Sequence, residues 1–304
     1  ETSLCMIDLA NDINQGGCGD CYYLSVLSSL AENPKNIKDM FLTKELNAAG
    51  CYAVQFFVNG EKTVVVVDDR FPYDTHHERW AFSRTDKSHA EIWVLILEKA
   101  WAKIYGSYQR IEAGDCSEAF AAQLAADKVL YPLDEYLNGR NEHVWEDIFA
   151  SDLKNYPMTT CVGSQLATDG DLSRAELKEK GLFDAHAYYY RSKDNKALER
   201  QDRKVVIDKE PTREEEWKGD WSDGSPQWND ITKQQVDYVD ANDGTFWICW
   251  KDYFEFFYIT TICYFNNDFQ DNFIADLILE NNGFGIVKMT NPSDVADKVV
   301  FTLN

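Results

Sequence analysis

A glycine-rich segment that ends in a cysteine is the part of this sequence best suited to chemistry. Residues 15–21 read Gln-Gly-Gly-Cys-Gly-Asp-Cys, and an apolar stripe with helical spacing follows at once. Cys21 is therefore expected at the first turn of a helix, where free backbone N–H groups and the helix dipole favour a thiolate. Gln15 carries an amide that can donate to a developing oxyanion. These residues predict a nucleophilic cysteine, and a buried structural cysteine is the alternative.

Cys18 and Cys21 also form a C-x-x-C pair, a spacing found in redox and zinc sites. A thioredoxin-type pair follows a strand in a βαβ unit, and no such strand is predicted upstream. A zinc site needs a second pair at matching spacing, which the sequence does not show. A thiol oxidoreductase is therefore the less favoured hypothesis, while oxidation of Cys18 onto Cys21 as an off switch stays open.

A cysteine nucleophile needs a base, and His186 is the best placed of the five histidines. Residues 181–188 read Gly-Leu-Phe-Asp-Ala-His-Ala-Tyr, which puts His186 at the head of a β-strand after a turn. A strand-start imidazole facing a helix-start thiol is the arrangement of papain-like proteases. The alternative is a histidine whose hydrogen bonds are satisfied within the sheet.

The elements that must position these residues differ between the two halves of the chain. In the first half, the pattern predicts a hairpin over 52–58 and 62–68 and an amphipathic helix over 91–105. Asn59-Gly60 supplies the hairpin turn, and Ser88 and Glu91 are spaced as a capping box at the helix start. Gly114 marks the expected domain boundary.

The second half is expected to carry most of an antiparallel sheet. The predicted helices cover 117–126, 142–155 and 172–180, and the predicted strands cover 159–162, 186–191, 203–207, 245–249 and 258–265. Between 194 and 243 the chain is acid-rich with few β signals, which favours long surface loops.

Composition limits the class of partner. The 304 residues carry a net charge of -22, which argues against nucleic acid and anionic membranes as partners and permits bound cations. No apolar run approaches the length of a membrane span, so no integral membrane contact is expected. No secretory signal is visible, and the eight cysteines do not form a disulfide scaffold. These features favour reduced thiols and a cytoplasmic protein.

Several segments together resemble one family. They are the cysteine segment 15–21, the histidine segment 185–188, the tryptophan-rich loop 217–228, and the segments 67–72, 97–108, 243–247 and 262–263. In order and spacing, over about residues 10–265, they resemble the calpain family. The resemblance implies an α+β, papain-like protease core of two lobes, with Cys21 on a helical lobe and His186 on an antiparallel β lobe.

The resemblance gives three expected domains. Residues 1–113 form the first lobe with the nucleophile helix and the hairpin, and residues 114–265 form the second lobe with the sheet and the histidine loop. Residues 266–304 alternate in β fashion and are expected to begin an incomplete C-terminal β-sandwich-like module.

The chain departs from the family pattern next to the histidine. The family has an Asn-Pro-Trp triplet whose Asn orients the imidazole, and this sequence has Glu210-Pro211-Thr212. A carboxylate at Glu210 accepts an N–H as an amide oxygen does and stabilises an imidazolium. Burying its charge costs desolvation free energy. A milder departure is Tyr22, where the family usually has Trp.

The resemblance also implies calcium, with one non-EF-hand site in each lobe. The matching residues are Asp12 and Glu91 in the first lobe and Glu216, Asp223 and Asp243 in the second. Carboxylate oxygens are the ligands that Ca²⁺ prefers. Thr245 stands where the family usually has a further Glu. As alternatives, Glu91 serves only the capping box and Asp12 is only a loop acid.

The leading hypothesis is a calcium-activated intracellular cysteine endopeptidase that cleaves protein substrates. Cys21 attacks the scissile carbonyl, His186 moves the proton and Glu210 orients His186. Gln15 and the backbone N–H of Cys21 hold the oxyanion. The alternative is a catalytically silent relative that binds calcium or partner proteins, which Glu210 favours. The sequence is silent on oligomeric state.

Overall fold

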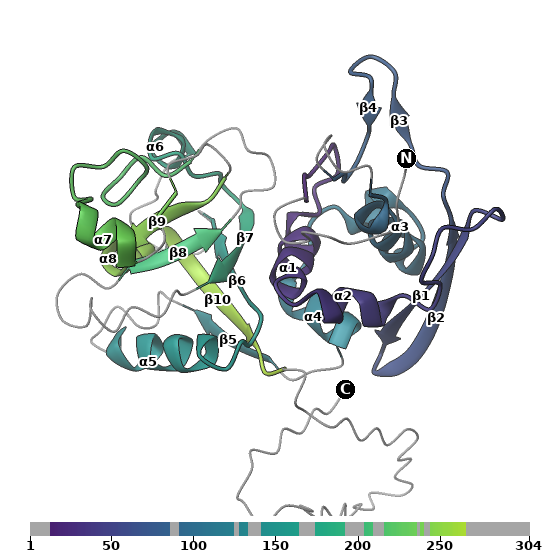
Figure 1. The fold of residues 1–304 in the computed structure, drawn as a ribbon, viewed down its shortest axis with the longest axis horizontal. Coiled ribbons are helices and arrows are strands. Elements are labelled where there is room, and N and C mark those ends of the chain that lie inside the picture. The colour runs from purple at the N-terminus through teal and green to yellow at the C-terminus, as the bar shows by residue number, and fades with distance from the viewer. Residues whose placement is uncertain are drawn as a thin grey trace, which may run out of the picture.

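The computed structural model describes residues 13–85, 91–124, 128–132, 141–163, 174–191, 204–208, 216–235, 238–239 and 244–265. Figure 1 shows two groups of elements side by side. We call the described residues up to Leu124 the first lobe and those from Lys128 onward the second lobe. The last 39 residues, where a C-terminal module is expected, lie outside the described part.

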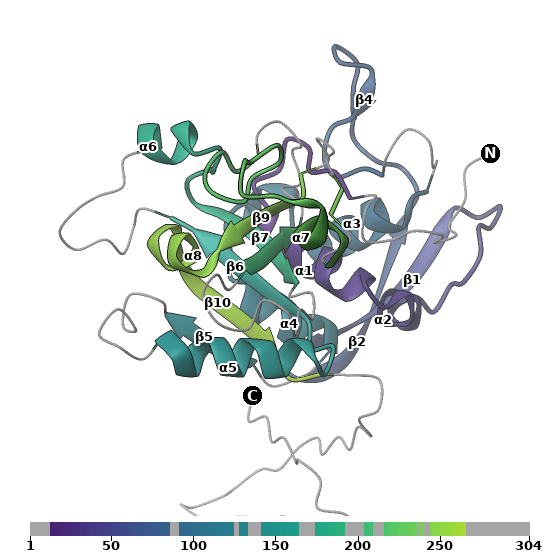
Figure 2. The ribbon, with the colours of Figure 1, turned by 60° about the vertical axis from the view of Figure 1, so that its left-hand side comes forward.

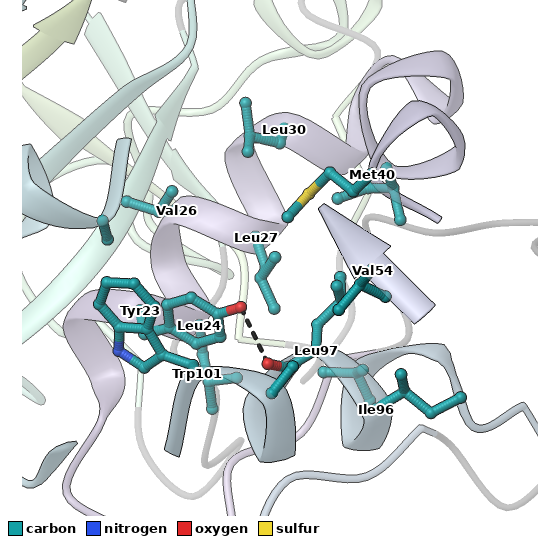
Figure 3. Close-up of a cluster of buried hydrophobic side chains, with 14 of the residues drawn as sticks. Tyr23, Leu24, Val26, Leu27, Leu30, Met40, Val54, Ile96, Leu97 and Trp101 are labelled. Carbon is teal, nitrogen blue, oxygen red and sulfur yellow. Dashed lines mark hydrogen bonds between the residues drawn. The ribbon is translucent and has the colours of Figure 1, made fainter. Parts of the chain in front are cut away.

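The first lobe combines helices with two antiparallel pairs of strands. Its elements are α1 (Cys21–Ala31), α2 (Pro34–Met40), β1 (Cys51–Val58), β2 (Glu61–Asp68), β3 (Tyr73–Asp74), β4 (Arg79–Trp80), α3 (Trp93–Tyr105), η1 (Tyr108–Ile111) and α4 (Cys116–Leu124). In the core, Tyr23 stacks on Trp101 with ring centroids 4.9 Å apart and donates its hydroxyl to the Leu97 carbonyl at 3.1 Å (Figure 3). This contact ties α1 to α3, since an aromatic pair adds to the free energy of area burial.

The hairpin follows from its turn sequence. Val58 pairs with Glu61, so the loop holds only Asn59 and Gly60, and both have positive φ (53° and 80°). Positive φ at both central positions matches the twist of antiparallel strands and favours Asn-Gly. The hairpin prediction is confirmed.

The second lobe is a six-stranded antiparallel sheet with helices packed on it, in the order β5-β10-β6-β7-β8-β9. The strands are β5 (Lys128–Pro132), β6 (Met158–Val162), β7 (His186–Arg191), β8 (Lys204–Asp208), β9 (Phe246–Cys249) and β10 (Phe257–Cys263), and the helices are α5 (Asn141–Asp152), α6 (Arg174–Glu179), α7 (Asp230–Gln235) and α8 (Trp250–Phe256). Figure 2 shows α5 alongside β5 and β10, and Val144 and Ile148 of α5 belong to the same buried cluster as Met158 and Ile262. The α+β fold expected from the sequence is confirmed.

The lobes meet where α1 packs against β6 and β7 (Figure 1). The Ser29 hydroxyl accepts a hydrogen bond from the Met158 backbone N–H at 2.9 Å. At the far end of α1, the Tyr189 hydroxyl donates to Glu32 at 2.7 Å. The first lobe therefore presents the nucleophile helix directly to the sheet.

Several predicted boundaries shift. Helix α3 begins at Trp93 with Ile92 as its N-cap, so the capping box with Glu91 is wrong, and Ser88 lies outside the described residues. Helix α4 packs against α1 and β1 and its apolar residues join the first buried cluster. The boundary at Gly114 stays a prediction, and this packing favours one after Leu124.

In the described part of the chain, every helix is too short or too polar to cross a membrane.

Candidate active site

Cys21 is the first residue of α1, as the sequence predicts. The helix starts here because the Asp20 carbonyl accepts from the backbone N–H groups of Tyr23 (2.9 Å) and Leu24 (3.1 Å). The Cys21 sulfur accepts hydrogen bonds from the backbone N–H of Tyr22, at the open end of the helix, and from that of Ala187. Ala187 follows His186 in the chain, so the thiol reaches across to the strand that carries the imidazole.

Helix α1 is held firmly on all sides. Every residue from Tyr22 to Ala31 is buried, which fixes the direction in which Cys21 points. Gly114 packs against the Tyr22 ring so closely that a Cβ there would lie 2.4 Å from it. The Tyr22 hydroxyl in turn accepts from the Trp101 indole at 3.0 Å. The aromatic ring at position 22 therefore serves to pack α1 against Gly114 and Trp101.

Gln15 lies in a loop that a neighbouring segment pins in place. Its side-chain amide donates to the Cys18 backbone carbonyl at 2.7 Å. The backbone carbonyl of Gln15 accepts from the Arg84 guanidinium at 3.0 Å. Gly17 N–H donates to the Ala81 carbonyl at 2.7 Å. At Gly16 a Cβ would lie 2.1 Å from the Phe82 carbonyl oxygen, so only glycine allows this approach. The loop is thus preorganised beside Cys21 by backbone contacts.

The Cys18 thiol lies apart from this chemistry. It donates to the Tyr108 carbonyl at 3.6 Å, and burial together with the Asp20 carboxyl raises its pKa. A thiol that keeps its proton attacks disulfides slowly. This environment argues against the oxidoreductase hypothesis.

His186 opens β7, directly after Ala185, which has a positive φ of 53°. The imidazole packs edge-on to Tyr188, with ring centroids 5.0 Å apart, and against Phe183 at 6.0 Å. The side chain is 9% exposed. Behind this turn, a Cβ on Gly181 would lie 1.8 Å from the Glu216 carbonyl, so glycine is required there. The strand-start position predicted for His186 is confirmed.

Burial sets the protonation of both groups in this state. It raises the pKa of Cys21 to about 11, against the lowering effect of the two backbone N–H donors. It lowers the pKa of His186 to about 4. At neutral pH the pair is therefore a thiol and a neutral imidazole. The thiolate expected from the helix start alone is outweighed by desolvation.

A pair of buried acids lies beside the nucleophile. It was not predicted from the sequence. Asp20 is 0% exposed and Glu98, on α3, is 2% exposed. Their carboxyl groups lie within hydrogen-bond reach of each other, and Glu98 also accepts from the Ser83 backbone N–H at 2.9 Å. Burial raises the pKa of both, that of Glu98 to about 7. Two facing buried carboxyl groups disfavour the state in which both are ionised, so the pair retains a proton.

This acid pair connects the parts of the site. Asp20 precedes Cys21, while Ser83 lies in the segment that pins the Gln15 loop. The available signal was that Glu98 interrupts the apolar run of α3, in which every residue from Trp93 to Leu97 is buried. A charged residue in such a run predicts a buried partner.

Comparison with known proteins agrees with this geometry. A sequence model described as calpain family cysteine protease matches residues 4–264. The chain belongs to the calpain family of cysteine proteases.

Individual calpains are similar to the chain at about the same level. It is 31% identical over 249 residues to the maize calpain-type cysteine protease DEK1, covering 80% of this chain and 11% of that protein. It is 31% identical over 276 residues to mouse calpain-8 (84% and 36%) and 29% identical over 259 residues to Caenorhabditis elegans calpain clp-4 (83% and 35%). The chain thus spans about a tenth to a third of the length of these relatives.

The structure describes some, but not all, of the acids that the calpain resemblance assigns to calcium. Asp12, Asp243 and the orienting candidate Glu210 lie outside the described residues. Glu91 is buried just before α3, and Glu216 accepts from the Gly244 backbone N–H at 2.7 Å. Within the described ranges, no three His, Cys, Asp or Glu side chains gather as a metal site.

The tryptophan-rich loop packs as a support for the histidine side of this calpain core. Trp217 is buried in the second lobe against Phe256, with ring centroids 5.3 Å apart, and donates its indole N–H to the Asp220 carbonyl at 2.8 Å. Trp221 packs edge-on to Trp228 at 4.9 Å in a separate small cluster. Asp223 follows in the same loop.

Proposed function

We propose that this chain is the protease core of a calcium-activated cysteine endopeptidase that cleaves protein substrates in the cytoplasm. One observation carries the proposal: the Cys21 sulfur accepts from the backbone N–H of Ala187. The nucleophile on the first lobe therefore lies next to the residue that carries the base on the second. A structural cysteine does not need a preorganised donor loop beside it, and Gln15 lies in such a loop.

The protonation states of Cys21 and His186 before the reaction determine the order of the proposed steps. Because Cys21 is a thiol and His186 is neutral, the imidazole takes the thiol proton as the sulfur attacks the scissile carbonyl. The carbonyl oxygen becomes an oxyanion, which the backbone N–H of Cys21 and the Gln15 amide stabilise. The imidazolium then protonates the leaving amine. Water, deprotonated by His186, hydrolyses the resulting thioester and frees Cys21.

Glu210 is proposed to orient the imidazole during these steps. What supports this is the direction of the described strands: β8 is antiparallel to β7 and ends at Asp208, opposite Tyr189. At Asp208 the direction of β8 is therefore toward the His186 end of β7. An imidazolium beside a carboxylate is stabilised, which makes the proton transfer from Cys21 easier.

Calcium is proposed to bind through Asp12 and Glu91 in the first lobe and through Glu216, Asp223 and Asp243 in the second. The donor chemistry fits, since each set consists of carboxylates and Ca²⁺ prefers oxygen ligands. Glu91 is a buried acid just before α3. With one set in each lobe, ion binding favours a single arrangement of the two lobes.

The decisive experiment is casein hydrolysis by the full chain, with calcium and then with a chelator. Hydrolysis that needs calcium and is lost in Cys21→Ala supports the proposal. Cys51→Ala serves as the control, since Cys51 is exposed and lies on the hairpin. Turnover that survives in Cys21→Ala contradicts the assigned nucleophile. An unchanged calcium titration in Asp12→Ala/Glu91→Ala removes the first calcium site.

The silent relative is the second candidate, and Glu210 in place of the family's Asn favours it. Thiol alkylation separates the two. Rapid, calcium-dependent labelling of Cys21 indicates a protease, whereas labelling of Cys21 no faster than that of Cys51 indicates the silent form. The Glu210→Asn variant then tests the departure itself. Higher activity in the variant indicates that Glu210 is a defect, and lower activity indicates that the site is adapted to Glu210.

A further inference from the structure

A pair of thiols that the proposed mechanism does not use lies between the two lobes. The sulfur atoms of Cys116 and Cys161 are 4.0 Å apart. Cys116 opens α4 in the first lobe, and Cys161 lies on β6 of the second. Each is a free thiol in this structure. Cys161 packs against the buried cluster of the first lobe to which Cys116 belongs, while its strand is part of the sheet of the second lobe, so the pair lies where the lobes meet.

The position of the pair relates it to the active site. Cys161 is opposite Ala187 in the β6–β7 register, and Ala187 is the residue whose N–H reaches the Cys21 sulfur. The Ser25 hydroxyl of α1 lies 3.8 Å from the Cys116 sulfur. The thiol pair therefore lies behind the nucleophile, on the surface where α1 meets the sheet.

We propose that peroxide oxidises Cys116 and Cys161 to a disulfide that ties the two lobes together. A disulfide needs a sulfur separation of about 2 Å, so the two sulfur atoms must approach by about 2 Å. Cys161 is only half-buried, which gives a small oxidant a route to the pair, whereas Cys116 is 4% exposed.

The two thiols differ in pKa, and this difference determines which sulfur reacts with peroxide first. The hydrogen bond from Cys161 lowers the pKa of the Cys116 thiol, and the same contact keeps Cys161 protonated. The Cys116 thiolate attacks one oxygen of hydrogen peroxide, the O–O bond breaks, and hydroxide leaves as water once protonated. Cys116 is then a sulfenic acid.

In the second step the Cys161 sulfur attacks the sulfur of Cys116 and the S–O bond breaks. The departing hydroxide takes the Cys161 proton and leaves as water. In sum, two thiols lose two electrons and two protons, and one peroxide becomes two waters. Cys21 competes poorly in the first step, because burial raises its pKa to about 11.

The test is peroxide treatment of the full chain in a Cys21→Ser background, which removes the nucleophile as a competing thiol. We expect an intact mass lower by two hydrogen atoms and a peptide map that joins the segments around Cys116 and Cys161. Reduction by dithiothreitol should restore the original mass. Because the link crosses the lobes, the midpoint of thermal unfolding should rise by at least about 5 °C on oxidation.

Matched variants make the assignment specific. Cys116→Ser and Cys161→Ser should each abolish the mass change, while Cys51→Ser should leave it intact. The peptide map of the unsubstituted pair stands on its own if a variant folds poorly. A link that joins other cysteines, sulfinic acids without a link, or both thiols still open to alkylation after peroxide would each overturn the proposal. These outcomes are independent of peptidase activity, so the protease proposal is tested separately.

Discussion

Replacing Glu98 by Gln tests whether the shared proton of the acid pair governs stability. Gln keeps the size of Glu98 and can still accept from the Ser83 N–H, while its amide donates to Asp20. We expect the stability of the natural protein, measured relative to that of the variant, to fall as the pH rises. Urea unfolding followed by tryptophan fluorescence, repeated from about pH 5 to about pH 8, measures the free energy of unfolding at each pH.

The size of the effect follows from the Glu98 pKa. Its ordinary value is 4.5 and burial raises it to about 7. Between these values the folded chain binds more protons at Glu98 than the unfolded chain does. The stabilisation is thus fully present below about pH 4.5 and is lost as the pH rises through about 7. At about 1.4 kcal/mol per pKa unit, the loss is about 3 kcal/mol.

The comparison needs a control at an acid outside the pair. Glu112→Gln changes an exposed side chain and should leave the pH dependence unchanged. Groups outside the pair, including His186, titrate alike in the natural protein and in Glu98→Gln, so their contributions largely cancel, whereas any change at Asp20 belongs to the effect of the pair. If the stability curves of the natural protein and Glu98→Gln run parallel over the whole range, folding does not raise the pKa of Glu98 and our account of the pair is wrong.

Two further predictions concern the same site. His186→Asn should remove a rise in stability between about pH 4 and about pH 6.5, because the buried neutral imidazole binds fewer protons when folded; the same urea series measures it, and an unaltered slope would show that His186 is not buried in its neutral form. Gly16→Ala should lower kcat for peptide hydrolysis at least about tenfold, because its Cβ would displace the Gln15 loop from Phe82; unchanged kinetics would show that the loop does not need that position.

The sequence predicted much of the fold, because its strongest patterns are local. The Asn59-Gly60 turn set the hairpin register, and the helix and strand that begin at Cys21 and His186 were placed at their first residues. The elements that escaped prediction are short or depend on distant partners. Among the described strands, β5 lies at an edge of the sheet beside β10, and α8 follows β9 without an intervening loop. Their patterns carry little periodicity of their own.

The sequence predicted the residues of the site better than it predicted their protonation states. Spacing indicated the neighbourhood of Cys21 and His186, which the Cys21–Ala187 contact supports. The protonation of both groups depends on burial, which local patterns do not report. The Asp20–Glu98 pair joins positions 78 residues apart, so only the packing of α3 against the loop before α1 reveals it.

The serines on α1 have a consequence for dissecting the protein. Ser29 faces the second lobe and accepts from Met158, while Ser25 lies near Cys116 of α4 where the two lobes meet. A polypeptide truncated after Leu124 would expose this side of the nucleophile helix to water, together with the apolar residues around it. Each half therefore depends on the other to cover this surface.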